Sequence, residues 1–576
     1  MPQGPSWAAY AGYWVALVKG AIVACGQTER EAYLAAKSAR CREEPEVVYV
    51  SPDGRLAATS ASVPGEESPE PLGSPRLAEG ERRAGYWTMP TLVAHLAREI
   101  QPFGVKAYLV GGGVRDILLG RDTRDLDMAL DGDALGVGRA LADRLGGAYF
   151  PLDEEREVAR VVLTWRGERA HLDIASLRGG NITEDLRGRD FTVNALALSL
   201  DDLRRDAIID LTGGLADLEA GILRAVSEST FRDDPCRLLR AVRFAGELSF
   251  ALDEATERSI VANAALLAGV SAERARDELN RMLILPRAGR CVRESDRLGL
   301  LPILLPELEA LRGMAQPLPH VWDALEHSIR TVEAMDELVL ALRGERASIL
   351  GLGSDLDSVK RELSEYLWQD LAPEQPRLAV LRLAALLHDI GKPATRTERG
   401  GVVHFYDHPQ EGAQICTAAM SRLRYSANAI RLAATLTREH MRLLSLARMR
   451  EPTRRALYRF YRDLGDAAPA AGLLFLADIL ATRPVDAEPQ WTSVLAVVGR
   501  TVRGYFTEPN IANPQPLVNG RELMEALGVQ EGPVVGHLIE TIREAQAAGS
   551  VRTRAQALAC ASRVLQRWRR SQHDSC

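Results

Sequence analysis

The chain has 576 residues, and its 71 Lys and Arg against 78 Asp and Glu give a formal net charge of −7. At about 150 residues per domain this length predicts three or four domains, and the 46% hydrophobic share excludes a wholly disordered or fibrous chain. The seven cysteines, without a C-x-x-C pair, argue against a disulfide framework or a zinc ribbon. Because we find no apolar run of about 18–20 residues and no basic leader, we expect a cytoplasmic protein with no membrane contact.

The order of predicted elements divides the chain into six segments. Residues 1–50 predict a small module with the order strand, strand, helix, strand, and 51–87, rich in Pro, Gly, Ser and Glu, predict a linker. Strand-like runs alternate with helical patterns over 88–225, which predicts an α+β domain on a mixed β-sheet. The remainder predicts an all-α neck, body and tail: 226–310, 311–507 and 508–576.

Two stretches are basic although the whole chain is acidic. Residues 549–570 hold six Arg and no acid, and 422–450 hold seven Arg against one Glu. Such stretches can bind a phosphate backbone locally, but a solvated helix face produces the same pattern, and both interpretations stay open.

A glycine-rich turn lies early in the α+β domain. An apolar run ends at Val110, Gly111 and Gly112 begin a run of three glycines, and VRDILLG continues as a predicted helix. Glycines let the backbone approach a ligand, and the first N–H groups of a helix favour anions, so the turn suits a triphosphate. Glycines also simply make turns.

Two carboxylates follow the turn on a predicted strand. In DLDMAL, Asp125 and Asp127 point to one face because side chains alternate along a strand. Adjacent carboxylates repel each other unless cations lie between them, and Mg²⁺ takes carboxylates together with substrate phosphates. We therefore predict two Mg²⁺ here; the alternative is a solvent-facing acidic edge strand.

Four motifs in this order and spacing resemble the class II tRNA nucleotidyltransferase and bacterial poly(A) polymerase family. They are G-G-x-V-R-D, D-x-D, RDFTVNALAL (189–198) and DDPCRLLRAVRF (233–244). SAERARDELNRML (271–283) and LGLLPILLPEL (298–308) resemble the neck of that family. The resemblance implies that an RNA 3′-hydroxyl attacks the α-phosphate of CTP or ATP and that pyrophosphate leaves.

The resemblance also implies roles for single residues. Gly111, Gly112 and Arg115 would hold the triphosphate, and Asp125 and Asp127 would bind the catalytic Mg²⁺.

Further implied roles lie on the following strands. Asp173 occupies the place of a third catalytic carboxylate, Arg189 would contact the nucleotide, and Asn194 would support the site. Asp173 could equally be a surface acid on a half-buried strand. The family often has Arg where this chain has Gly188, which puts one phosphate or primer contact in doubt.

The run FRDDPCRLLRAVRF predicts a helix that opens after Phe231. Asp234 and Arg237 would then be i,i+3 neighbours, with Arg240 and Arg243 on the same face. A carboxylate beside a guanidinium matches the donor and acceptor of cytosine or adenine and not those of uracil or guanine. The resemblance implies the same selection of CTP and ATP, whereas the alternative is an ordinary ion pair.

Histidines concentrate in the second half of the chain. LLHDIGK, with HVWDALEHS before it and LFLADILAT after it, resembles the HD superfamily of metal-dependent phosphohydrolases. The resemblance implies one divalent metal on four ligands, and three more histidines near a second metal or phosphate. The first set is His327, His388, Asp389 and Asp478, and the second is His404, His408 and His440. Such ligands suit Mn²⁺, Fe²⁺, Ni²⁺, Co²⁺ or Mg²⁺. The alternative is a helical scaffold that receives the tRNA elbow.

Taken together, the sequence predicts an enzyme that adds C and A to RNA 3′ ends, with tRNA or another RNA, CTP and ATP as partners. A poly(A) polymerase or an enzyme that adds only CC or A shares all these motifs. A less favoured hypothesis is an HD phosphohydrolase with a non-catalytic RNA-binding head. The ligand of residues 1–50 and the oligomeric state stay open.

Overall fold

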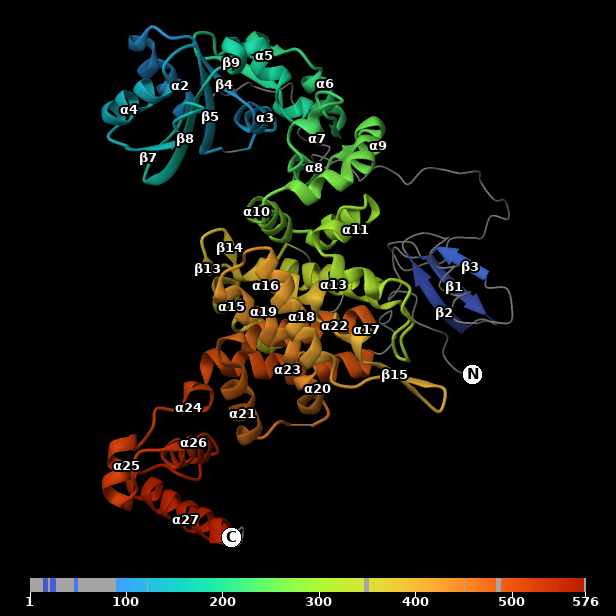
Figure 1. Ribbon diagram of the computed structural model, residues 1–576, viewed down its shortest axis with the longest axis vertical. Helices are drawn as coiled ribbons and strands as arrows, with labels where there is room; N and C mark the ends of the chain where they lie inside the picture. Colours follow the sequence, from blue (N-terminus) through green and yellow to red (C-terminus); the bar gives the residue numbers. More distant parts are fainter. Residues whose placement is uncertain are drawn as a thin grey trace. The chain divides into compact units, whose positions relative to one another are not determined.

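The computed structural model describes residues 14–18, 21–26, 46–49, 90–121, 123–345, 352–449, 451–482 and 488–573 (Figure 1). The helix predicted before residue 46 and the linker at 51–87 lie outside the described residues. The chain forms two compact units: one holds 69–285 and 290–306, and the other holds 1–68, 286–289 and 307–576.

Three strands predicted in the first 50 residues are present. They form one antiparallel sheet in the order β2-β1-β3. Their bounds are β1 (Trp14–Val18), β2 (Ala21–Gly26) and β3 (Glu46–Tyr49).

A mixed seven-stranded sheet forms the centre of the unit that begins at residue 69. Its strand order is β10-β9-β4-β5-β8-β7-β6, with β5 and β8 parallel and the other neighbours antiparallel. The strands are β4 (Ala107–Val110), β5 (Asp125–Leu130), β6 (Ala148–Asp153), β7 (Val158–Trp165), β8 (Glu168–Ser176), β9 (Leu196–Ser199) and β10 (Ile208–Asp210). The predicted mixed sheet with helices is confirmed.

Strand β5 is the middle strand of this sheet. Leu126 and Met128 are buried, whereas the alternate residues Asp125 and Asp127 are exposed, as the strand period requires. The alternative of an acidic edge strand is therefore wrong. Neighbouring strands can bring groups to the acids from both sides.

Helices cover the apolar face of the sheet. Leu92 and Leu96 of α2 and Leu141 of α4 join Leu109 and Leu126 in one buried cluster. The helices of this domain are α2 (Thr91–Ile100), α3 (Gly112–Leu118), α4 (Ala134–Leu145), α5 (Ile182–Arg187) and α6 (Gly214–Ala220).

The neck continues the same unit as short helices, α8 packing on α10, with a two-stranded parallel pair. The elements are β11 (Ile222–Leu223), α7 (Thr230–Asp233), α8 (Arg237–Leu248), β12 (Ala251–Leu252), α9 (Glu254–Asn263), α10 (Ala272–Leu283), α11 (Ala288–Arg297) and α12 (Leu301–Leu304). The single helix predicted after Phe231 is wrong. Asp234 is extended (φ −149°, ψ 100°) because a residue before proline, here Pro235, avoids the helical region.

The second unit is a helical bundle around α16. Every residue of α16 is buried, as expected for a helix that is apolar on almost all sides, and α13, α19 and α22 pack against it (Figure 1). The helices are α13 (Ala324–Arg343), α14 (Gly353–Asp357), α15 (Lys360–Leu367), α16 (Arg377–Leu387), α17 (Lys392–Thr395), α18 (His408–Arg422), α19 (Ala427–Glu439), α20 (Arg442–Ala447), α21 (Arg454–Leu464), α22 (Ala468–Thr482) and α23 (Glu488–Thr507).

Two hairpins and the tail complete this unit. The hairpins are β13 (Asp370–Ala372) with β14 (Gln375–Pro376), and β15 (Arg396–Arg399) with β16 (Val402–Phe405). The tail helices are α24 (Pro509–Ala512), α25 (Gly520–Leu527), α26 (Pro533–Ala547) and α27 (Arg554–His573).

One described helical stretch, Arg454–Thr482, is long and apolar enough to span a membrane by length and composition. Of its most apolar window, 72% is buried inside the protein. The core helix of a bundle has the same character, so this stretch is weak support for a membrane segment.

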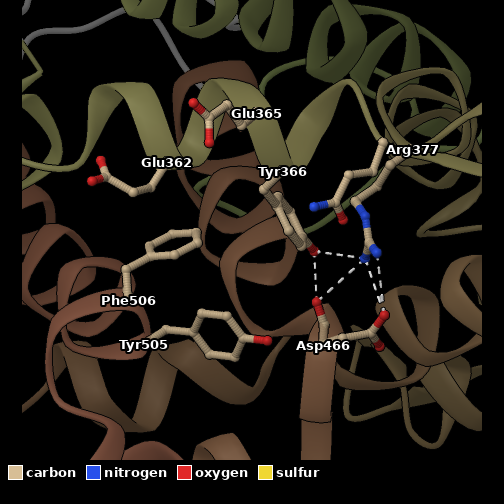
Figure 2. A pocket seen from close by; sticks show the side chains of 8 residues that line it. Glu362, Glu365, Tyr366, Arg377, Asp466, Tyr505 and Phe506 are labelled. Atoms are coloured by element: carbon tan, nitrogen blue, oxygen red, sulfur yellow. Dashed lines mark hydrogen bonds and ion pairs between the residues drawn. The ribbon is translucent and has the colours of Figure 1, made fainter.

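A buried arginine of α16 joins α15 and the 3₁₀ turn at 465–467 (Figure 2). Arg377 donates to Tyr366 Oη (3.1 Å) and to Asp466 Oδ2 (3.2 Å), and its guanidinium lies 4.2 Å from the centroid of the Tyr366 ring. Tyr366 Oη donates in turn to the Asp466 carbonyl (2.7 Å). Tyr505 and Phe506 line the same hollow of about 330 Å³. Because the guanidinium already donates to groups of the protein, we interpret the hydrogen-bonded cluster of Arg377, Tyr366 and Asp466 as a structural brace and the hollow beside it as no ligand site.

Replacing Arg377 by Met should therefore destabilise the bundle by about 1–3 kcal/mol, the cost of leaving buried hydrogen-bonding groups unpaired. Urea unfolding of the full chain measures the effect. The control is Arg361→Met, because the Arg361 side chain is 81% exposed and pairs only at 3.7–3.9 Å, so about 0.5 kcal/mol or less is expected. Equal effects of both substitutions would contradict the brace.

Candidate functional site

The glycine turn and the acid pair meet at the junction of β4 and β5. Val110, the last residue of β4, pairs in register with Asp127. Gly111 has φ +69°, and a Cβ there would lie 2.8 Å from Arg189 Nη1 and 3.2 Å from Asp127 Oδ2. Only glycine fits this conformation and this spacing, so the turn, the acid and the arginine converge at one point.

A row of charged side chains crosses three strands at the same level. Asp127 pairs in register with Asp173 of β8, and Asp173 with Arg160 of β7. Arg160 binds both carboxylate oxygens of Asp173, through Nε (2.7 Å) and Nη2 (2.8 Å). The prediction that Asp173 lies beside the acid pair agrees with this geometry.

A second row lies one pleat away. Asp125 pairs in register with His171, whose Nδ1 lies 2.9 Å from Asp125 Oδ1. The sequence analysis missed His171 and Arg160 because neither belongs to a motif. Only the strand register brings them to the acids.

Charge crowding acts on Asp127 in particular. Although the residue lies on the exposed face of β5, the surrounding protein atoms desolvate its carboxyl and raise the pKa of that group; Arg189 opposes this shift, and Asp173 adds to it. A divalent cation at the carboxylates would favour the ionised form, so the residues fit a Mg²⁺ site of the kind predicted.

Arg189 is held from behind by a buried acid. Its Nε and Nη2 donate to Asp185 Oδ2 at 3.0 and 2.8 Å, and the Asp185 side chain is 4% exposed. The remaining Nη1 faces Gly111. The predicted nucleotide contact is therefore available on the side of the glycine turn.

Arg115 and Asn194 lie in a buried hydrogen-bond chain. Arg115 donates to Asn194 Oδ1 (2.7 Å) and to both carboxylate oxygens of Asp116 (3.0 and 3.1 Å). Asn194 Nδ2 donates to Asp190 Oδ1 (3.1 Å). The prediction for Asn194 as a supporting residue agrees with this. Arg115 is only 4% exposed, so a triphosphate contact would require it to leave these partners.

Arg240 and Arg243 extend this chain into the neck. Arg240 donates to Asp190 Oδ2 at 2.5 and 3.0 Å, and burial opposes the ionisation of Asp190, but Arg240 holds the pKa of that carboxyl below its usual value. Arg243 is bound at 2.7 Å by Glu278 and by Glu247. Acids hold both guanidinium groups, and the predicted contact of Arg240 and Arg243 with the nucleotide stays a prediction.

Asp234 and Arg237 are anchored separately. Arg274 donates to Asp234 Oδ2 (2.7 Å), and Arg237 Nη2 donates to the Gly188 carbonyl (2.7 Å). The predicted i,i+3 contact on one helix face is wrong, since Asp234 precedes the helix. Both side chains are half-buried and keep hydrogen-bonding capacity, since Arg237 uses two of its five N–H groups in bonds to Gly188 and Thr230.

In the helical unit, the predicted HD residues come together at the end of α16. His327, His388 and Asp478 form one group in which the ligand atoms lie within 4.8 Å of one another, and Asp389, His408 and His440 form another. Six of the seven predicted ligands are thus brought together.

Asp389 lies between the two groups. Its Oδ2 is 3.3 Å from His388 Nε2, and its Oδ1 is 3.4 Å from His408 Nε2. We predicted Asp389 in the first set alone, but the geometry lets one carboxylate bridge both groups. Lys392 Nζ also contacts Asp389 Oδ2, a partner that the sequence analysis did not identify.

His404 belongs to neither group among the described residues. Its ring stacks on Tyr406 instead, with centroids 5.1 Å apart. His404 also lines a cavity of about 280 Å³, the HD cavity, whose wall includes Asp389, His408 and His440. Its predicted role near a second metal or phosphate therefore stays a prediction.

The tautomers of three histidines are fixed by the backbone. Nδ1 of His388, His408 and His440 lies 2.7–2.8 Å from the carbonyls of residues 385, 405 and 437. Since each Nδ1 must donate to its carbonyl, each Nε2 lone pair points into the site, as metal-binding histidines require.

Titration in this site follows burial and charge. Burial, together with His388, lowers the pKa of His440 to about 4. Burial opposes ionisation of Asp389, yet His388 and Lys392 hold the pKa of that carboxyl well below its usual range. Burial opposes protonation of His388, but Asp389 and Asp478 raise the pKa of its imidazole, so a bound metal would have to displace that proton. The lowered pKa values of His440 and Asp389 favour the neutral imidazole and the ionised carboxylate that divalent metals bind.

The basic stretches differ in the structure. Arg422 of the first is bound by Glu307, and Arg442 by Glu439 and Asp463. In the tail, Arg563, Arg567 and Arg569 are exposed on α27. The first stretch also has exposed arginines, at positions 424, 431 and 438, so both stretches could contact a phosphate backbone.

Comparisons with known proteins agree with this geometry. Three family models match: "Poly A polymerase head domain" over 107–224, "Probable RNA and SrmB- binding site of polymerase A" over 249–311, and "HD domain" over 324–483. The fold and the two sites therefore define a nucleotidyltransferase with an HD domain.

The chain is 37% identical over 477 residues to the A-adding tRNA nucleotidyltransferase of Deinococcus radiodurans, covering 81% of this chain and 97% of that protein. It is also 37% identical to the CC-adding tRNA nucleotidyltransferase of Thermus thermophilus, over 79% of this chain and 92% of the relative. The chain belongs to the tRNA nucleotidyltransferase family. The Thermotoga maritima CCA-adding enzyme complexed with tRNA has the same fold, with a TM-score of 0.51 at 21% identity over 83% of this chain and 97% of that one.

Proposed function

We propose that the protein adds C, A or both to the 3′ end of tRNA, using CTP and ATP. The observation that carries this proposal is the convergence of Gly111, Asp127 and Arg189 beside Asp125 on the central strand. The full-length relatives described above are an A-adding and a CC-adding enzyme, so the extent of addition is a matter for the product analysis below. Cytoplasmic location and the lack of a membrane partner stay predictions.

Each side of the acid pair has its own part in the reaction. The glycine turn and Arg189 Nη1 would bind the triphosphate, while Asp173, held by Arg160, would orient the RNA 3′-hydroxyl from the β8 side. Asp125 and Asp127 would hold Mg²⁺, which supplies positive charge for the attacking oxygen and the leaving pyrophosphate.

Base selection would rest on Asp234 and Arg237. A carboxylate accepts from the exocyclic amino group of cytosine or adenine, and a guanidinium donates to the adjacent ring nitrogen. Uracil and guanine present the reverse order and would leave buried groups unpaired. Arg274 and the Gly188 carbonyl hold the two side chains in place for this contact.

Asp125→Asn or Asp127→Asn should reduce nucleotide incorporation by at least about 100-fold, because the amide cannot replace the charge that binds Mg²⁺. Labelled CTP and ATP on tRNA lacking its 3′ end give the rates, and gel shift gives tRNA binding, which should stay nearly unchanged. Asp201→Asn is the control, because Asp201 is exposed. Incorporation within about tenfold of wild type in Asp125→Asn or Asp127→Asn would sink the assignment.

Asp234→Asn and Arg237→Met should relax discrimination of CTP and ATP against UTP and GTP by about 1–3 kcal/mol, the value of one good bidentate base contact. Single-turnover rates with each labelled triphosphate measure this, and the product lengths distinguish CC, A and CCA addition from a poly(A) tail. The exposed neighbour Arg232→Met is the control. Loss of rate with full selectivity would make the pair structural.

A second candidate function is hydrolysis of a phosphoester at the HD site. The inward-pointing Nε2 atoms and the bridging position of Asp389 favour it over a bare scaffold. A bound divalent metal would generate hydroxide near neutral pH. A 2′,3′-cyclic phosphate or a phosphomonoester at a damaged RNA end is a fitting substrate, since such an end must be cleared before nucleotides are added.

Asp389→Asn and His440→Gln should remove a bound Mn²⁺, Ni²⁺ or Co²⁺ and abolish such hydrolysis, while incorporation changes less than about twofold. Metal content after dialysis and phosphodiesterase assays measure both effects, and circular dichroism confirms folding. A wild-type protein that binds no metal and hydrolyses none of these esters would make the domain a scaffold.

A further inference from the structure

An exposed aromatic stack stands at the HD cavity. Tyr406 is 56% exposed, and its ring lies on that of His404, with centroids 5.1 Å apart and planes 16° from parallel. Both residues line the cavity that contains Asp389, His408 and His440. We propose that Tyr406 is a nucleobase platform, so that the substrates of the HD site carry a base next to the scissile phosphoester. This rests on the proposed hydrolytic function and names its substrate determinant.

The backbone couples the platform to the metal-binding groups. β16 ends at Phe405, whose carbonyl lies 2.8 Å from His408 Nδ1. Tyr406 and Asp407 form the two-residue connection to α18, and Asp407 adopts the left-handed conformation (φ +62°) that makes this turn tight. The ring of Tyr406 is therefore held two residues from His408 in the chain and lines the same cavity.

The surroundings of the ring suit a flat, partly apolar group. Met441, which directly follows the ligand His440, is 42% exposed and lines the same cavity. The Arg399 guanidinium lies 5.9 Å from the centroid of Tyr406, near the outer limit of a cation–π contact, and leaves most of the side chain accessible. Exposed aromatic rings beside cationic side chains are the usual surface for stacking single-stranded bases.

The inner wall of the cavity is polar instead. His320 lines it, and its buried Nδ1 has no hydrogen-bond partner within the described residues. Lys392 Nζ lies 2.5 Å from Gln316 Oε1 on the same wall. The cavity is thus polar inside and aromatic at its mouth. A ligand with its phosphate and ribose inside and its base at the mouth matches this arrangement, whereas a phosphate ester without a base would make no contact with Tyr406.

Stacking on an aromatic side chain contributes about 1–3 kcal/mol per base, which corresponds to about 5- to 150-fold in affinity. The test compares adenosine 3′-monophosphate with ribose 3-phosphate, which lacks the base, by titration calorimetry on the full chain with Mn²⁺. Tyr406→Ala should weaken binding of the nucleotide at least fivefold and leave ribose 3-phosphate unchanged. Tyr406→Phe should bind the nucleotide like wild type.

Trp368→Ala is the matched control, because Trp368 is a 42% exposed aromatic residue of the same unit outside this cavity. Nucleotide binding at the head is common to all variants and cancels in the comparison. Wild-type affinity that does not depend on the base, or equal nucleotide binding by Tyr406→Ala and wild type, would overturn the platform.

Hydrolysis of adenosine 2′,3′-cyclic phosphate distinguishes failure of the Tyr406 platform from failure of the proposed hydrolytic function of the HD site. A higher KM with nearly unchanged kcat in Tyr406→Ala supports the platform on an active site. Base-dependent binding that needs Tyr406, without any hydrolysis, supports the platform and defeats the hydrolytic function.

Discussion

Repulsion among carboxylates is the constraint on which the head domain depends. Asp125, Asp127 and Asp173 lie on two adjacent parallel strands. Desolvation is the main cause of the raised pKa of Asp127, and repulsion from Asp173 and Asp125 adds to it. The protein offsets this cost from both sides of the strand pair, with Arg189 beside the glycine turn and Arg160 on β7. A site with three acids and two nearby arginines is stable enough to fold yet still favours added cations.

A buried network of hydrogen bonds and ion pairs, from Arg115 to Arg243, explains how the glycine turn is held in position. Asp190 accepts from Asn194 on one side and from Arg240 on the other, so the glycine turn, the 3₁₀ turn at 192–194 and helix α8 share one network. Buried networks of this kind are costly when partly unpaired and rigid when complete. The neck is thereby tied to the catalytic sheet through hydrogen bonds rather than apolar packing alone.

Much of the site could be predicted from the sequence, because its signals are local. The alternation in DLD placed Asp125 and Asp127 on one face, and the HD dipeptide with its flanking runs located four residues of the two metal-binding groups. Other features could not be read this way. Pro235 broke a helix that periodicity alone extended, and Arg115, Arg240 and Arg243 resemble exposed phosphate-binding residues until their acidic partners are known. Arg160 and His171 follow only from the register of β7 and β8 with β5.

The two sites differ in donor chemistry, and this difference has a consequence for how one chain can hold both. Around Asp125 and Asp127 the metal donors are carboxylate oxygens, which favour Mg²⁺ with its retained waters and substrate phosphates. At the HD site four imidazole nitrogens surround Asp389 and Asp478, a set that favours transition metals. Because the imidazole set is buried and three of its rings are held by backbone carbonyls, it would hold a metal without help from a substrate. The carboxylate pair instead lies on the exposed face of β5, and a metal there would need the phosphates of a nucleotide to complete its coordination.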